Sequence, residues 1–198
     1  MNTAEFDKYD YYKKSVQTPD VEAEFLTKTY KDLRGYAPGK FREDFCGTFA
    51  VSCEVAKLDS SAQVYGVDID EEPIQYGREN NLSQLSPESA ERVQLSQGSV
   101  LDPEALPESN LVCALNFSYF SFKERSVLKR YYENVYHSLS SDGIFIMDCF
   151  GGSQCYESNE EETEHEEDGF SYFWDQDNYN PITNEAQFYI HFHCHKYQ

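Results

Sequence analysis

Positive charge is scarce in this sequence, and so are several segments that mark common classes of protein. The 198 residues include 16 lysines and arginines against 36 aspartates and glutamates, a formal net charge of -20. Such a charge repels phosphate backbones and anionic lipid, so we expect neither nucleic acid nor a membrane as partner. The sequence also shows no membrane-length apolar run and no leader with a basic and then an apolar region.

The sequence also lacks several motifs of metal, cofactor and catalytic sites, which excludes some classes of enzyme. The six cysteines are scattered without a CxxC pair, which indicates a reduced, cytoplasmic protein. No GxGxxG segment supports a nicotinamide site, and no nucleophile-elbow spacing supports a hydrolase. His191, His193 and His195 alternate along one predicted strand, but an exposed hairpin face explains them better than zinc does, so we expect no metal.

Strand-like and helix-like segments alternate strictly through the middle of the chain. This pattern predicts an α/β fold with a doubly wound, mostly parallel sheet that carries helices on both faces. The expected strands are residues 40–45, 63–67, 92–95, 111–115 and 143–150, and the expected helices are residues 20–34, 49–58, 72–82 and 124–139.

The length and the 39% hydrophobic content favour a single domain over residues 1–198. Within it we expect an N-terminal arm and helix over 1–35 and a cofactor-binding core over 40–150. The carboxylate-rich residues 157–168 cannot bury themselves and read as a solvated loop. Residues 169–198 predict an antiparallel hairpin, with turn chemistry at Asn180–Asn184.

A tight turn follows the first expected strand, and a carboxylate ends the second. Gly47 lets the backbone approach a ligand closely, and the helix after it presents free amide groups there. Asp68 is placed to accept hydrogen bonds from ribose hydroxyls, although an exposed acid at a strand end is the alternative. Together they indicate a nucleotide-cofactor site beyond the carboxyl ends of the strands.

Three segments resemble motifs of the class I S-adenosylmethionine-dependent methyltransferases, whose sheets are Rossmann-like. They are Arg42–Thr48 (REDFCGT), Gly66–Asp70 (GVDID) and Ala114–Tyr119 (ALNFSY), and the first resembles a poorly characterised bacterial-type branch. The resemblance covers roughly residues 9–195 and implies S-adenosylmethionine as cofactor. It assigns to the cofactor site Glu43, Phe45, Gly47, Asp68, Ile69, Gly98, Ser99, Val100 and Asn116.

On that resemblance Asp68 binds the ribose, Ile69 lies against the adenine, and residues 98–100 flank the adenine edge. Asn116 and Tyr119 face the methyl group and the acceptor, and they are the catalytic candidates. Asn116 either orients an amine or hydroxyl acceptor or satisfies loop amides at a strand end.

Aromatic residues are candidates for the wall of the acceptor pocket, because aromatic faces attract sulfonium and ammonium cations. Tyr11, Tyr12 and Trp174 are the substrate-binding candidates. Packing is an equal alternative for the tyrosines and the preferred one for Trp174.

The sequence departs from the family pattern at three positions and at its end. Phe45 and Phe49 stand where glycine is common, and Ser99 replaces the usual acid after the third strand. The final helix and two strands of such enzymes have no counterpart, which suggests a truncated chain or a pared-down relative.

We therefore expect an S-adenosylmethionine-dependent methyltransferase that acts on a small-molecule or protein acceptor. The alternatives are a cofactor-binding or scaffold protein without turnover and, less favoured, a nicotinamide-dependent oxidoreductase. The sequence identifies neither the acceptor nor the oligomeric state.

Overall fold

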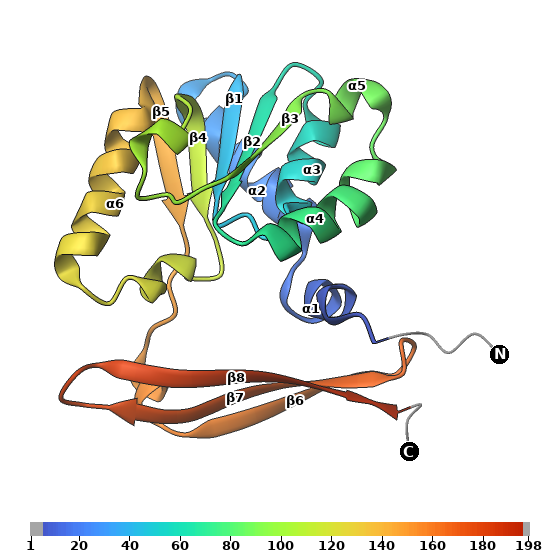
Figure 1. Ribbon diagram of the computed structural model, residues 1–198, viewed down its shortest axis with the longest axis vertical. Helices are drawn as coiled ribbons and strands as arrows, with labels where there is room; N and C mark the ends of the chain where they lie inside the picture. Colours follow the sequence, from blue (N-terminus) through green and yellow to red (C-terminus); the bar gives the residue numbers. More distant parts are fainter. Residues whose placement is uncertain (1–5, 196–198) are drawn as a thin grey trace. The chain divides into compact units, whose positions relative to one another are not determined.

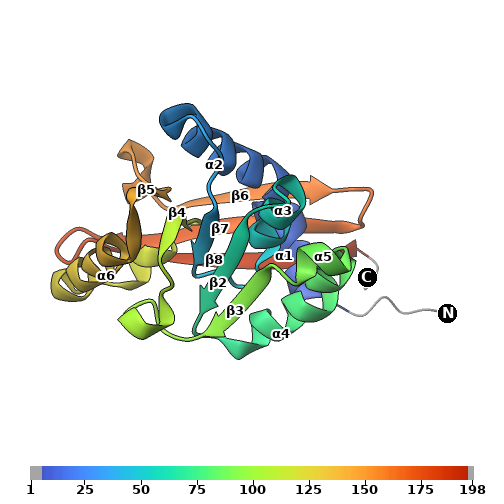
Figure 2. The ribbon, with the colours of Figure 1, turned by 90° about the horizontal axis from the view of Figure 1, so that it is seen from above.

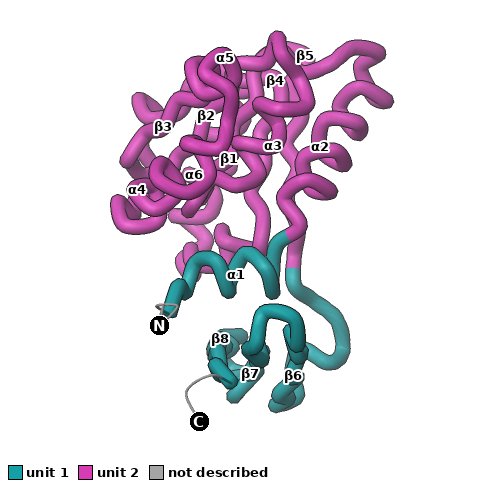
Figure 3. Tube along the Cα trace, turned by 90° about the vertical axis from the view of Figure 1, so that its right-hand side faces the viewer, with its two compact units in different colours: residues 1–17, 150–198 teal, residues 18–149 magenta. Residues whose placement is uncertain are grey.

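The computed structural model describes residues 6–195, which form two compact units (Figure 3). One unit is Thr18–Cys149, and the other joins the described residues before Thr18 to those from Phe150 onward. Residues 1–5 of the predicted arm and 196–198 of the predicted hairpin lie outside the described residues. That the whole chain is one domain stays a prediction.

The larger unit contains a sheet of five parallel strands in the order β3-β2-β1-β4-β5 (Figures 1 and 2). The order reverses between β1 and β4, the position at which ligands bind in open α/β sheets. The predicted α/β fold is therefore confirmed. The strands are β1 Lys40–Asp44, β2 Gln63–Asp68, β3 Val93–Gln97, β4 Ser109–Ala114 and β5 Leu139–Met147.

Helices cover both faces of this sheet because buried residues along each strand alternate between two apolar clusters. Leu111 packs with α2 and α3, whereas the next residue, Val112, packs with α6. The helices are α2 Pro19–Arg34, α3 Ala50–Leu58, α4 Glu71–Asn80, α5 Pro87–Ala90 and α6 Arg125–Ser138, with short 3-10 turns η1 Leu82–Gln84, η2 Pro103–Ala105 and η3 Ser118–Ser121.

The central strand β1 carries a buried ion pair. Arg42 Nε donates to Asp44 Oδ1 over 2.8 Å, and both side chains are fully buried. Arg42 also donates to the Pro107 carbonyl and to Ser138 Oγ, and the Tyr131 hydroxyl donates to Asp44 Oδ2. These contacts satisfy two charges that would otherwise be costly to bury.

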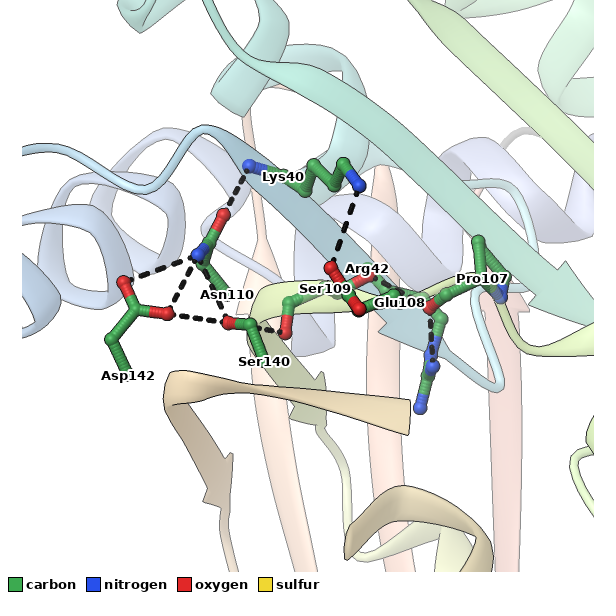
Figure 4. Close-up of polar contacts among 8 residues, drawn as sticks. All are labelled: Lys40, Arg42, Pro107, Glu108, Ser109, Asn110, Ser140 and Asp142. Carbon is green, nitrogen blue, oxygen red and sulfur yellow. Dashed lines mark hydrogen bonds and ion pairs between the residues drawn. The ribbon is translucent and has the colours of Figure 1, made fainter. Parts of the chain in front are cut away.

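At the amino ends of the strands, side chains form a polar network around Asp142 of β5. Its carboxylate accepts from Asn110 Nδ2 over 2.9 Å, from Ser140 Oγ over 2.6 Å and from the hydroxyls of Tyr30 and Tyr36. Hydrogen bonds from Ser140 and then the two tyrosines hold the pKa of Asp142 well below its usual range. Figure 4 shows this end of the sheet, where Asn110 also accepts from the backbone of Lys40.

The smaller unit contains an antiparallel sheet in the order β6-β7-β8. Its strands are β6 Asn159–His165, β7 Phe170–Asn180 and β8 Glu185–Cys194, preceded by the turn η4 Ser153–Tyr156. The predicted hairpin corresponds to β7 and β8, and Asn184 in its turn has a φ of 59°.

The N-terminal segment forms a helix, α1 Lys8–Val16, where the sequence suggested only an arm. Asp7 caps it by accepting from the amides of Tyr9 and Asp10. Tyr11 stacks on Phe170 of β7 with ring centroids 4.3 Å apart. The helix is therefore held by contacts with the sheet of its own unit.

The prediction of a loop over residues 157–168 is wrong for Asn159–His165, which form β6. Seven residues of β6 pair in register with β7, and the alternation of side chains directs Glu160, Glu162 and Glu164 to one exposed face. An edge strand tolerates such charges, which also discourage pairing with other chains. The backbone ladder supplies the stability that the composition does not indicate.

In residues 6–195 no helix combines the length and the apolar character that crossing a membrane requires.

Candidate functional site

The candidate site lies in the loops that follow β1, β2, β3 and β4. The first loop has a left-handed backbone at three positions, with φ of 59° at Phe45, 51° at Gly47 and 46° at Phe49. A Cβ atom built on Gly47 would meet no atom within 4 Å, so open space lies beside this glycine. Strained backbone of this kind is concentrated at ligand-binding sites.

Asp68, the last residue of β2, fastens the first loop. Its Oδ2 accepts from the Gly47 amide over 2.7 Å, and its Oδ1 accepts from the Asp70 amide over 2.9 Å. The carboxylate is half-buried and therefore retains access to solvent. This bond joins Asp68 and Gly47, which are twenty-one positions apart in sequence, and their role in a cofactor site stays a prediction.

The next two segments continue this surface. Ile69 has 72% of its area exposed, so its side chain is accessible to a ligand. The Gly98 amide donates to the Asp68 carbonyl over 2.8 Å, which places the start of the 98–100 segment beside Asp68. Ser99 is half-buried, whereas Val100 is buried in the apolar cluster under α6.

The two phenylalanines keep the loop shape that glycine usually supplies. The ring of Phe45 packs against Phe122 and Tyr131, with centroids 5.7 Å and 5.4 Å away. Phe49 is fully buried beside Gly77 of α4, where an added Cβ would lie 2.4 Å from the Phe49 ring. Both rings are thus anchored in apolar surroundings, and core packing offsets the strain of their left-handed backbone.

Glu43, a buried residue of β1, bonds to the first turn of α3. Its carboxylate accepts from the Ser52 amide over 3.0 Å and from Ser52 Oγ over 2.6 Å. No side chain caps α3 at its N-cap residue, Phe49, so Glu43 satisfies the first turn of that helix. Burial raises the pKa of Glu43 to about 8.

In the loop after β4, as at Asp68, a carboxylate accepts hydrogen bonds from backbone amides of a neighbouring loop. Asn116 and Phe117 have φ of 53° and 41°, and their amides donate to the two oxygens of Asp148 over 2.7 Å and 2.6 Å. The Tyr119 hydroxyl donates to the Asp148 carbonyl over 2.9 Å. Asp148 was missed by the sequence analysis, although it follows the apolar strand β5 as Asp68 ends β2.

Carboxylates dominate the electrostatics of this site. The pKa of Glu22 of α2 is raised by burial and by the charge of Asp148, and the charges of Glu22 and Asp68 also raise the pKa of Glu43. Among residues 6–195, no three His, Cys, Asp or Glu side chains are grouped to hold a metal ion. The arrangement favours a ligand with a positive centre.

The remaining candidates belong to the smaller unit. Tyr11 stacks on Phe170, and Tyr12 is half-buried in α1. Trp174 stacks on Phe188 with centroids 5.0 Å apart and also lines a cavity. Their role in binding an acceptor stays a prediction, as do the assigned roles of the other site residues.

No family model matches this sequence, and no curated protein does either. Solved structures of methyltransferases do share its fold. An S-adenosylmethionine-dependent methyltransferase from Clostridium acetobutylicum is 15% identical with a TM-score of 0.69, and 93% of this chain aligns with 78% of that one.

Two further structures give the same result. DesVI from Streptomyces venezuelae is 13% identical with a TM-score of 0.71 and coverages of 96% of this chain and 83% of that chain. The sugar N-methyltransferase KedS8 from Streptoalloteichus is 14% identical with a TM-score of 0.64 and coverages of 95% and 78%. The chain therefore has the fold of class I S-adenosylmethionine-dependent methyltransferases.

Proposed function

We propose that this chain binds S-adenosylmethionine at the carboxyl end of its parallel sheet and transfers the methyl group to a small-molecule or protein acceptor. The observation that carries the proposal is the left-handed turn at Gly47, fastened to Asp68 at the point where the strand order reverses. A further support is the shared fold with methyltransferases.

The residues present fit this cofactor. The open space beside Gly47 is where a side chain would obstruct a ligand, and the half-buried Asp68 carboxylate has lone pairs that can accept hydrogen bonds from ribose hydroxyls. The exposed Ile69 side chain offers an apolar surface for a base, next to Gly98 and Ser99. The surrounding carboxylates favour the positive charge of a sulfonium.

S-adenosylmethionine supplies an electrophilic methyl group when it is bound. Transfer by in-line displacement requires chiefly that the reactants be positioned and that water be excluded. We propose that Asn116, with its backbone fixed by Asp148, orients the acceptor. Tyr119 is buried and its hydroxyl is bonded to the Asp148 carbonyl, so we assign it the positioning of this loop.

Calorimetry with S-adenosylhomocysteine, S-adenosylmethionine and NAD tests the cofactor. We expect the first two to bind and NAD to bind at least about tenfold more weakly. Asp68→Ala should weaken S-adenosylhomocysteine by about 1.5 to 3 kcal/mol, the range for hydrogen bonds to a charged group.

Asp70→Ala is the matched control, because Asp70 is exposed and caps α4 through the Glu72 amide. It should leave the affinity within about twofold of wild type. Equal affinities for wild type and Asp68→Ala would refute the ribose role. Binding without methyl transfer to a panel of amines, hydroxyls and proteins would favour the alternative of a binding protein without turnover.

A further inference from the structure

The smaller unit contains a cavity of about 590 Å³, and its lining includes no residue of the loops after β1, β2, β3 and β4. Its walls are the 150–155 segment, residues 157–159 and the strand residues Glu161, Trp174 and Gln176. All of them belong to the same compact unit. The volume falls in the range of small-molecule sites in proteins.

Strand pairing explains why these side chains share one wall. Asn159 lies opposite Gln176, and Glu161 lies opposite Trp174. Residues directly opposite in an antiparallel pair point to the same face of the sheet. Glu160 and Glu162 alternate with them and therefore point to the other face.

Gln176 presents a hydrogen-bond acceptor in this wall. Only 5% of the residue is exposed, and its amide nitrogen donates to the carbonyls of Gln154, over 3.0 Å, and of Glu157. Two carbonyl partners fix which end of the amide is nitrogen. Among the described residues the amide oxygen accepts no hydrogen bond, and it keeps some solvent access although the residue as a whole is buried, so it can accept from a ligand.

The charge of the cavity selects the kind of ligand. Glu157 and Glu161 contribute carboxylates, and none of the lining residues is Lys, Arg or His. The ring centroids of Phe150 and Trp174 lie 6.0 Å apart, and the faces of such aromatic rings attract cations. Within the described part of the chain no three metal-ligating side chains gather, which favours an organic cation over a metal ion.

We propose that this cavity binds the ammonium group of a small organic amine. The N–H groups donate to the Gln176 amide oxygen and to the Glu161 carboxylate, and the apolar body of the ligand packs beside Trp174. The inference does not depend on methyl transfer, because it concerns binding to the smaller unit alone.

Trp174 is the only tryptophan of the chain, so its fluorescence reports directly on this cavity. The full chain is titrated with benzylamine and with benzyl alcohol, which has similar size but no charge. Benzylamine should change the emission saturably, and benzyl alcohol should bind at least about tenfold more weakly. Glu161→Gln should weaken benzylamine by about fivefold or more, a typical effect of losing a charged acceptor.

The matched control is Glu162→Gln, which removes the same charge from the next position but from the opposite face. It should leave the affinity for benzylamine within about twofold, since the Glu162 side chain points away from the cavity. Equal binding of the amine and the alcohol, equal weakening by the two variants, or no saturable binding would each overturn the proposal. Saturable competition by calcium chloride would overturn it as well and indicate a metal site.

Discussion

The two ends of the five-stranded sheet are built in opposite ways. At the amino ends, side chains bond to one another around Asp142, and donors from α2, β4 and β5 satisfy its carboxylate. At the carboxyl ends, carboxylates instead bond to backbone amides of neighbouring loops, as Asp68 does to Gly47 and Asp148 to Asn116. Gly47 and Asn116 have left-handed backbone, whereas the residues that bond to the Asp142 carboxylate do not, and the left-handed residue beside them is Gly35, which precedes Tyr36.

This difference separates stability from binding. A network whose members satisfy one another leaves little for a ligand to gain, whereas the loop at Gly47 has left-handed backbone with open space beside it. Substitutions at the amino end should therefore change the free energy of unfolding, and those at the carboxyl end should change cofactor affinity. Matched pairs of variants test this contrast.

The largest effect is expected from Gly47→Val, compared with Gly35→Val at the C-terminus of α2. Both glycines have positive φ, 51° and 85°, and neither would bring a Cβ within 4 Å of another atom. Both variants should lose about 1 to 3 kcal/mol of stability from backbone strain, measured by urea unfolding. Only Gly47→Val should abolish S-adenosylhomocysteine binding in calorimetry.

If Gly47→Val does not fold, Gly47→Ala and Gly35→Ala repeat the comparison with a smaller side chain. Wild-type affinity in a folded Gly47 variant would contradict the ligand role of this glycine.

The second prediction concerns the pH dependence that Glu43 imposes on stability. Its pKa of about 8 in the folded chain exceeds the ordinary value of 4.5, so the folded state holds its proton more tightly. The resulting stability is present in full below about pH 4.5 and is lost as the pH rises through about 8. Glu43→Gln keeps an acceptor for Ser52 and should remove this slope.

Thermal unfolding at pH 5 and pH 9 tests the effect of Glu43. From pH 5 to pH 9 the free energy of unfolding of wild type should fall relative to that of the variant by on the order of a few kcal/mol. A parallel pH dependence in both proteins would mean that Glu43 titrates normally.

The third prediction is that Asp142, at the amino ends of the strands, gives stability the opposite dependence on pH. The pKa of Asp142 is lowered by its hydrogen bonds, so its stabilisation is present above the ordinary value of 3.8 and is lost as the pH falls through the lower folded value. Asp142→Asn should cost about 1 to 2 kcal/mol at neutral pH and less in acid. Cofactor affinity should stay at the wild-type value, and a tenfold loss would contradict the separation of the two ends.

The smallest effect is expected from Asp148→Asn. Asparagine keeps one acceptor oxygen for the loop after β4 but replaces the other by a donor, which cannot bond to the second amide. Affinity for S-adenosylhomocysteine should fall about three- to fivefold, equivalent to about 1 kcal/mol, while stability changes little. A change in stability without a change in affinity would assign Asp148 to the fold alone.

Much of the unit with the parallel sheet could be predicted from the sequence, because hydrophobic residues recur with a different period in its strands and in its helices. The segment from Lys40 to Met147 alternates buried strands with amphipathic helices, and the turn at Gly47 and the acid at Asp68 occupy the expected ends. Local patterns were sufficient there because each segment buries its own apolar face.

The missed elements depend on distant partners. Strand β6 has the sequence NEEETEH, which contains no aliphatic hydrophobic residue and so gives no strand pattern. Its pairing with β7 is what identifies it as a strand. Phenylalanine at a left-handed position contradicts local propensity, and the packing of Phe45 on Phe122 and Tyr131 explains it afterwards. Asp148 acts on amides that follow a different strand, a relation that the linear sequence does not express.

The buried ion pair of Arg42 and Asp44 has a consequence for how this lineage diverges. Both residues belong to the most recognisable segment of the chain, yet they are fully buried and bonded to the interior. Selection for folding alone would preserve them, so their presence in a related chain would not by itself indicate that the chain binds a ligand. An exposed residue such as Ile69 has no such role in the interior, and its identity is the better guide to binding.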